Sequence, residues 1–124
     1  MTPNLKDLHA LYASAVNAGS VDAVLEFYED NATFVTGLGT SVAGKPAIRE
    51  AILGFLALKP KIRIETISIF EGDPNLALME SQWVLDGTGS DGQPVRLTGL
   101  SREVLRRHAN GNWLYAIDDP GVGR

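Results

Sequence analysis

The sequence from Gly99 to Pro120 reads Gly-Leu-Ser-Arg-Glu-Val-Leu-Arg-Arg-His-Ala-Asn-Gly-Asn-Trp-Leu-Tyr-Ala-Ile-Asp-Asp-Pro and predicts one long β-hairpin. Asn110-Gly111 is the dipeptide that best tolerates positive φ at both central positions of a type I′ turn. Such a turn also matches the twist of the strands that it joins. We therefore expect a two-residue loop in which Ala109 opposes Asn112, and this loop fixes the register of both strands.

This register sorts the hairpin side chains onto two faces. It pairs Leu105 with Ala116 and Glu103 with Asp118, and side chains alternate between faces along each strand. One expected face carries Leu105, Leu114, Ala116, Ser101, Glu103 and Asp118, and the other carries Val104, Trp113, Tyr115, Ile117, Arg102, Arg106 and Asp119. Because both faces are half apolar, we expect packing on each side of the sheet and two facing carboxylates on one side.

The composition is that of one ordinary globular domain. The chain has 124 residues, of which 44% are hydrophobic and 21% are charged, so we expect a single domain over residues 1–124. The formal net charge of -4 argues against a nucleic-acid partner, because such partners require a basic surface. The chain has no cysteine, which excludes disulfides, thiol nucleophiles and thiolate metal sites.

The first residues show no signal for export or membrane insertion. Met1-Thr2-Pro3-Asn4 leads into Lys6 without the apolar core of a signal peptide. No apolar run in the chain approaches the length needed to span a bilayer. We therefore expect a cytoplasmic protein with no membrane partner.

The chain before residue 60 predicts three helices and one short strand. Apolar residues recur at helical spacing over 5–18, 20–29 and 46–58. Gly19 suits a left-handed helix end, and Ser20 can cap the second helix. Residues 32–35 are expected as a strand. The glycine-rich stretch from Thr36 to Gly44 is expected as a loop.

From Lys61 onward the apolar period changes to two. Four strands are expected over 61–70, 76–85, 95–107 and 113–118, separated by turn residues. In the first of them Ile62 and Ile64 have one parity and Ile67 and Ile69 have the other, which predicts a β-bulge. The element order α-α-β-α-β-β-β-β predicts an α+β fold, with three helices on one side of a strongly curved, mainly antiparallel sheet.

Several segments resemble the nuclear transport factor 2-like superfamily. They are Leu11-Tyr-Ala-Ser-Ala-Val-Asn-Ala-Gly-Ser-Val-Asp22, Tyr28-Glu-Asp-Asn-Ala-Thr-Phe34 and Gly44-Lys-Pro-Ala-Ile-Arg49. The ending, Glu103-Val-Leu-Arg-Arg107 with Trp113 and Ile117-Asp-Asp-Pro120, is similar to the SnoaL-like branch, whose relatives include ketosteroid isomerase and polyketide cyclases. The resemblance spans almost the whole chain and implies a cone-shaped fold around an apolar pocket, in a homodimer formed through the outer face of the sheet.

The resemblance does not imply one reaction, because the superfamily includes isomerases, cyclases, dehydratases, epoxide hydrolases and non-catalytic members. Tyr12 matches the oxyanion tyrosine of ketosteroid isomerase. Thr36 stands where that enzyme has its general-base aspartate, and Ser101 is the nearest match to its protonated aspartate. These two departures argue against steroid isomerisation. The two aspartates around an arginine of limonene epoxide hydrolase are not recognisable here.

Glu103 and Asp118 complete, with Tyr12, the candidate catalytic set. Like charges directly across a sheet destabilise it, and a core-facing pair would hold one proton between them. The alternative is that this face is wet, or that Arg63 or Arg96 neutralises the pair. For Tyr12 the alternative is a core tyrosine whose hydroxyl bonds the backbone.

Other residues are expected to line the pocket and bind the substrate: Tyr28, Thr36, Phe55, Met79, Trp83 and Ser101. For the aromatic residues and Met79, the alternative is simple core packing. His9 and His108 have no neighbours at metal-ligand spacing. We therefore expect two surface histidines, no metal and no cofactor.

Three classes of function remain open. The first is a cofactor-independent acid/base enzyme that isomerises, cyclises or dehydrates a small hydrophobic molecule, and we favour it. The second is a non-catalytic binder of such a molecule, and the third is an interaction module. The homodimer is expected through Val104, Trp113, Tyr115 and Ile117, because a soluble monomer would not leave that apolar band exposed.

Overall fold

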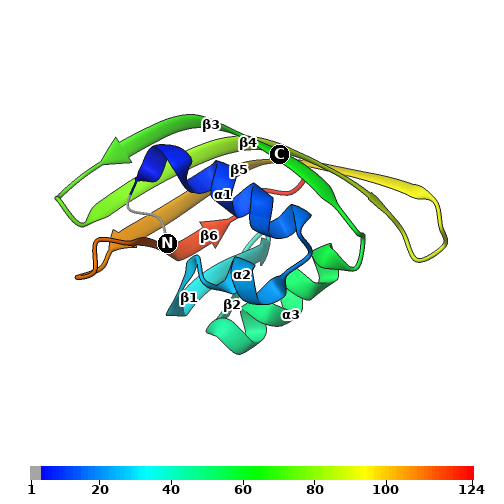
Figure 1. The fold of residues 1–124 in the computed structure, drawn as a ribbon, viewed down its shortest axis with the longest axis horizontal. Coiled ribbons are helices and arrows are strands. Elements are labelled where there is room, and N and C mark those ends of the chain that lie inside the picture. The colour runs from blue at the N-terminus through cyan, green and yellow to red at the C-terminus, as the bar shows by residue number, and fades with distance from the viewer. Residues whose placement is uncertain (1–3) are drawn as a thin grey trace.

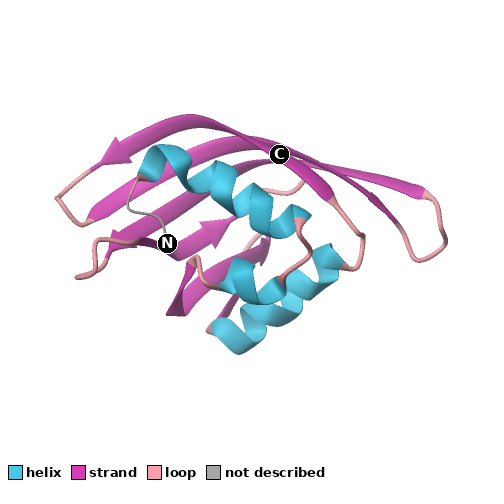
Figure 2. Ribbon diagram, viewed as in Figure 1, coloured by secondary structure: helices cyan, strands magenta, loops and turns pink. Residues whose placement is uncertain are grey.

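The computed structural model describes residues 4–124. They form one six-stranded sheet with three helices on one face. The elements are α1 (Leu5–Asn17), α2 (Val21–Leu25), β1 (Tyr28–Gly37), β2 (Thr40–Ala43), α3 (Lys45–Leu56), β3 (Lys61–Glu71), β4 (Leu76–Thr88), β5 (Pro94–Arg107) and β6 (Trp113–Asp119) (Figure 1). The strand order is β2-β1-β6-β5-β4-β3, and only β1 and β6 run parallel. Figure 2 shows the helices gathered on one side of the curved sheet, so the predicted α+β class is confirmed.

The helix ends follow the capping residues in the sequence. The Asn4 side chain accepts a hydrogen bond from the Lys6 amide at the start of α1, and the Ser20 hydroxyl accepts one from the Ala23 amide at the start of α2. Gly19 has a φ of 73° between the two helices. No helix within residues 4–124 combines the length and the apolarity that crossing a membrane requires.

The second helix is shorter than predicted. It ends at Leu25, and Tyr28 begins β1 instead of lying on an apolar helix face. The Tyr115 amide donates to the Phe27 carbonyl at 2.7 Å, and Tyr28 pairs with Tyr115 in the parallel ladder. Pairing with a strand almost ninety positions away overrides the local helical pattern.

The stretch from Thr36 to Gly44 was predicted as a loop, and this prediction was wrong. Most of the stretch belongs to a second hairpin. β1 continues to Gly37 and pairs with β2, placing Phe34 opposite Val42. Gly39 has a φ of 71° in the tight turn. The glycine signal therefore marks the turn alone. The predicted bulge in β3 is confirmed, because the register with β4 shifts between Thr66 and Ser68.

The hairpin of β5 and β6 has a three-residue loop instead of the predicted two-residue type I′ loop. The His108 amide donates to the Asn112 carbonyl at 2.8 Å, and the Gly111 amide donates to the His108 carbonyl at 2.9 Å. Gly111 has a φ of 87°, whereas Asn110 has none of the positive φ that a type I′ turn requires. The longer loop places Leu105 opposite Tyr115, so its predicted pairing with Ala116 was wrong.

A bulge at Ala116 then restores the predicted register. Val104 pairs with Ile117 on one side of the bulge, and Leu105 pairs with Tyr115 on the other. Beyond the bulge Glu103 lies opposite Asp118, as predicted. The extra loop residue and the extra bulge residue cancel, because each shifts the register by one position in opposite directions.

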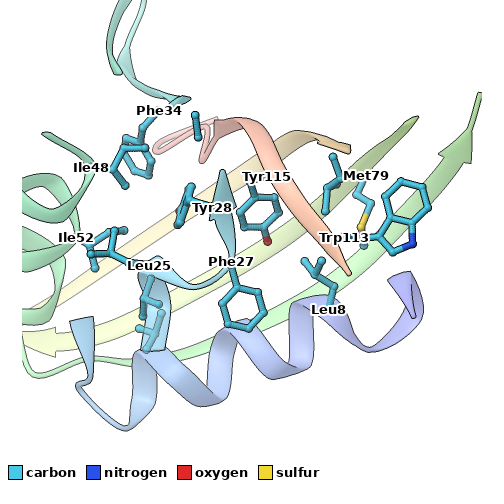
Figure 3. Close-up of a cluster of buried hydrophobic side chains, with 14 of the residues drawn as sticks. Leu8, Leu25, Phe27, Tyr28, Phe34, Ile48, Ile52, Met79, Trp113 and Tyr115 are labelled. Atoms are coloured by element: carbon cyan, nitrogen blue, oxygen red, sulfur yellow. The ribbon is translucent and has the colours of Figure 1, made fainter. Parts of the chain in front are cut away.

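The bulge also changes the face on which two aromatic residues lie. Trp113 and Tyr115 are 4% and 2% exposed and belong to the core. Figure 3 shows both on the side of the sheet that faces α1, in the cluster that holds Leu8 and Met79. Their prediction as part of an exposed dimer band was therefore wrong, since residues before a bulge lie on the opposite face from that expected of an unbroken strand.

Candidate functional site

A pocket opens between the helices and the inner face of the sheet. Its empty volume, with its open mouth included, is about 610 Å³. Its apolar wall includes Val16, Ile52, Phe55, Ile64 and Trp83. Polar side chains gather in the same pocket, and they are His9, Tyr12, Ser81, Ser101, Glu103 and Asp118. The pocket therefore combines an apolar wall with a compact polar end.

The structure brings most of the predicted site residues together. Those that line the pocket are Tyr12, Phe55, Trp83, Ser101, Glu103 and Asp118. Tyr28 is fully buried behind Asp118, and Met79 packs in the core away from the pocket. Thr36 is exposed on β1, where its hydroxyl bonds that of Thr40 at 2.9 Å, so it does not belong to the site.

The two carboxyl groups face each other in the interior. Glu103 and Asp118 are 3% and 6% exposed, so this face of the hairpin is not wet. Arg63 is exposed on β3, and Arg96 bonds Asp86 at 2.7 Å. Among residues 4–124, no arginine or lysine forms an ion pair with either buried carboxyl group. The alternative in which an arginine neutralises the pair is therefore wrong.

Asp118 is held by a chain of tyrosine hydroxyl groups. The Tyr28 hydroxyl donates to Asp118 Oδ2 at 2.5 Å, and the Tyr12 and Tyr28 hydroxyl oxygens lie 2.7 Å apart. Burial, and then the charge of Glu103, raise the pKa of Asp118 from 3.8 to about 8, although the Tyr28 hydrogen bond acts in the opposite direction. The raised pKa favours the protonated form of Asp118 at neutral pH. Its other oxygen, Oδ1, has no hydrogen-bond partner within residues 4–124 and is free to carry the proton.

Three tyrosines around this carboxyl group stay neutral. Burial is the main cause that raises the pKa of Tyr12, Tyr28 and Tyr115 well above 10. The charge that Asp118 carries when it ionises adds to the rise for all three, and Glu103 adds to it for Tyr12 and Tyr115. Their rings meet edge to face, with centroids 5.2 Å apart for Tyr28 and Tyr115 and 5.6 Å apart for Tyr12 and Tyr115. The ring packing fixes the Tyr28 hydroxyl group that bonds Asp118 and the Tyr12 hydroxyl group that bonds Tyr28.

His9 also lines the pocket and was not among the predicted site residues. It is 2% exposed, so its prediction as a surface histidine was wrong. Its Nε2 lies 2.6 Å from Glu103 Oε1, and its Nδ1 lies 2.6 Å from Thr66 Oγ1. The available signal was its place one helical turn before Tyr12, directly after Leu8 on the apolar stripe. The other histidine is half-buried and bonds Glu29 outside this pocket.

Trp83 is fixed as one wall of the pocket. Its indole Nε1 donates to the Pro120 carbonyl at 2.7 Å. A Cβ atom added to Gly99, its partner across the ladder, would lie 2.6 Å from the indole ring, so only glycine leaves room for this ring position. Ser81 and Ser101 bond each other through their hydroxyl groups beside it. No cluster of three or more metal-ligating side chains forms in the described part of the chain.

Comparisons with known proteins agree with this fold. A search of curated protein sequences finds no match. A solved ketosteroid isomerase-like protein from Erwinia carotovora superposes with a TM-score of 0.81 at 19% identity, over 93% of this chain and 90% of that one. An NTF-2-like protein of unknown function from Shewanella oneidensis gives 0.76 at 15% identity, over 93% of each chain.

The epoxide hydrolase/cyclase-like enzyme SalBIII, described with a role in pyran ring formation in the polyether salinomycin, gives a TM-score of 0.66 at 22% identity. It is matched over 95% of this chain and 89% of its own length. At these identities the structures establish a shared fold and no shared activity. The model of the SnoaL-like domain matches residues 8–115, a range that includes the pocket-lining residues of the helices and Glu103 and ends three residues before Asp118. The chain therefore belongs to the family of SnoaL-like domain proteins.

Proposed function

We propose that this protein catalyses acid/base chemistry, such as isomerisation, cyclisation or dehydration, on a small hydrophobic molecule. The observation that carries the proposal is Asp118, a buried carboxyl group whose pKa is raised to about 8 and which opens on an apolar pocket. An acid with a pKa near the working pH is well suited to donate and take back a proton. Glu103 across the ladder supplies the second group that such chemistry requires.

The two carboxyl groups take different roles in this proposal. Asp118 donates its proton from Oδ1 to a substrate oxygen, and Glu103 accepts a proton from a substrate carbon or hydroxyl group. In an isomerisation Glu103 returns that proton at another carbon, and Asp118 recovers its own from the substrate oxygen. In a dehydration the proton of Asp118 leaves with the hydroxyl group as water, and the proton that Glu103 took from the substrate carbon then passes across the ladder to Asp118 and restores the starting state. Each sequence balances without a cofactor.

The lining of the pocket favours an uncharged substrate. Among residues 4–124, no lysine or arginine lines the pocket, and its polar end already holds the two carboxyl groups. An anionic group placed there would lose its hydration without gaining a counter-ion. The family assignment and the fold shared with SalBIII support acid/base or cyclase chemistry without naming a substrate.

A direct test uses β-tetralone, an uncharged bicyclic ketone with acidic hydrogens beside its carbonyl group. We expect the protein to accelerate deuterium incorporation at that carbon in D₂O, followed by proton NMR, relative to buffer alone. Binding of β-tetralone in the pocket without faster exchange would contradict the enzymatic proposal. That result would support the alternative, a non-catalytic ligand-binding or dimerisation module.

We also propose a homodimer through the outer face of the sheet. Phe70, Leu78, Val104 and Ile117 are neighbours on four adjacent strands, from β3 to β6, and form what we call the outer apolar row. Phe70 and Ile117 are 57% and 42% exposed. A soluble monomer rarely exposes such a contiguous row, and a second copy of the same face would cover it.

Ile117→Glu tests this homodimer by placing a charge within the outer apolar row. We expect light scattering at micromolar concentration to give a dimer mass for the unmodified protein and a monomer mass for this variant. Leu38→Glu is the matched control, because Leu38 is 95% exposed at the tip of the hairpin of β1 and β2, outside the row. A monomer mass for the unmodified protein would contradict the proposal.

A further inference from the structure

His9 connects three elements at the polar end of the pocket. It projects from α1, and its two ring nitrogens contact Glu103 on β5 and Thr66 on β3, each at 2.6 Å. Thr66 is the last residue before the register shift in β3. A fully paired histidine in a buried polar network has a fixed ring orientation. Its contact with Glu103 is therefore part of the architecture of the site.

The hydrogen-bonding capacity of each group determines how the proton is placed. An ionised Glu103 can only accept, so His9 Nε2 carries a hydrogen and donates it. Thr66 can donate to Nδ1 of a neutral ring or accept from a charged one, and it therefore supports the same ring position in both states. Glu103 gains a donor close to its charge, whereas Asp118 receives only the Tyr28 hydroxyl.

We propose that His9, oriented by Thr66, is a positioning residue that keeps the negative charge of the carboxyl pair on Glu103 and the proton on Asp118. The inference deepens the proposed function and rests on it, because it explains which carboxyl group is the base and which is the acid. His9 is not required to touch the substrate for this role. It acts through Glu103.

Removal of His9 should exchange the two roles. Two facing carboxyl groups in apolar surroundings share one proton. Without the His9 donor, Glu103 has no hydrogen-bond partner within residues 4–124, whereas Asp118 keeps Tyr28. The proton then moves to Glu103, and Asp118 loses the repulsion that holds its own proton. The other groups that act on Asp118 are Tyr28 and Asp119, and neither changes.

The test is a carbon-13 NMR titration of the Asp118 side-chain carboxyl group in the ligand-free protein, assigned by comparison with Asp118→Asn. His9→Phe keeps the bulk of the ring and removes both nitrogens, and we expect its titration midpoint to fall by at least about one pH unit. His9→Gln places an amide nitrogen where Nε2 lies, so we expect a midpoint near that of the unmodified protein. An unchanged midpoint in His9→Phe would overturn the proposal.

The pair of His9 variants separates positioning from packing. If His9 only filled space, His9→Phe would disturb the site less than His9→Gln does. The titration midpoint of Asp118 would then shift in His9→Gln and stay unchanged in His9→Phe. Thr66→Val provides a second route if His9→Phe does not fold. We expect Thr66→Val to lower the titration midpoint of Asp118. Thr66→Ser keeps the hydroxyl group, so we expect it to leave this midpoint unchanged. Equal midpoints in both Thr66 variants would exclude the orienting role of Thr66.

His108→Phe is the matched control for loss of a histidine. His108 also bonds a glutamate, Glu29, at 2.7 Å, but outside the pocket, so we expect no change in Asp118. The titration requires no substrate. If β-tetralone shows no faster deuterium exchange but the Asp118 midpoints shift as expected, only the proposed function is rejected. If exchange is faster but the Asp118 midpoint is unchanged in His9→Phe, only the role of His9 is rejected.

Discussion

Asp118→Asn and Glu103→Gln are each expected to slow deuterium exchange into β-tetralone by about 10²- to 10⁴-fold, the range over which a positioned acid or base accelerates proton transfer. Both substitutions keep the size of the side chain and remove its ability to exchange a proton. The asparagine still accepts from the Tyr28 hydroxyl, which donates to Asp118 Oδ2 in the native site. The loss should therefore appear in kcat with the fold intact.

Asp119→Asn is the matched control for this prediction. Asp119 is the next residue on β6, but its carboxylate pairs with Arg102 and Arg124 and does not line the pocket. Its charge is the smallest of the influences that raise the pKa of Asp118, so its substitution should change the exchange rate far less than Asp118→Asn does. Exchange at the native rate by a folded Asp118→Asn variant, checked by circular dichroism, would show that Asp118 is not the acid.

Burial of Asp118 is also expected to make the stability of the protein depend strongly on pH. In the unfolded chain an aspartate ionises above its ordinary pKa of 3.8, whereas folded Asp118 keeps its proton up to a pKa of about 8. Unfolding therefore releases a proton between these two values, and the native state loses stability as the pH rises through them. The loss grows over the whole interval between the two pKa values, because each pH unit within it favours the unfolded, ionised form further.

Asp118→Asn removes this penalty, since the amide has no charge to bury. We expect the Tm of the variant to rise above that of the unmodified protein as the pH increases from 4 to 8, and the two values to be closest below pH 4. Chemical unfolding followed by tryptophan fluorescence at several pH values measures the difference in the free energy of unfolding. A difference that does not change with pH would contradict the burial of an ionisable Asp118.

The carboxyl pair was predicted correctly from the sequence, although the predicted turn beside it was wrong. Asn110-Gly111 marks the turn, and the alternation of side chains then leads to Glu103 and Asp118. The predicted turn type was nevertheless wrong, since the same dipeptide fits a three-residue loop with only Gly111 at positive φ. The register was correct at the carboxyl groups because the bulge at Ala116 compensates for the longer loop.

The bulge itself could not be predicted from local pattern. Trp113 and Tyr115 alternate regularly with their neighbours, and only their burial against the helices selects the inner face. That choice depends on the shape of the whole core, which brings Leu8 and Met79 to the same cluster. The same limit explains the helix end at Leu25, because the partner strand of Tyr28 lies at the far end of the chain.

His9 illustrates a different limit. The sequence places it on the buried stripe of α1, but nothing local indicates that Glu103 and Thr66 will meet its two nitrogens. A histidine without sequence neighbours of ligating type therefore looked like a surface residue. Contacts between residues more than fifty positions apart become visible only when the sheet and the helix have been assembled.

The proposed chemistry requires that Asp118 holds a proton in the folded protein at neutral pH. Its most direct test is the carbon-13 NMR titration of the Asp118 carboxyl group in the unmodified protein. We expect Asp118 to be protonated at neutral pH and to titrate with a pKa of about 8. Titration near its ordinary value of 3.8, with Asp118 ionised at neutral pH, would contradict it.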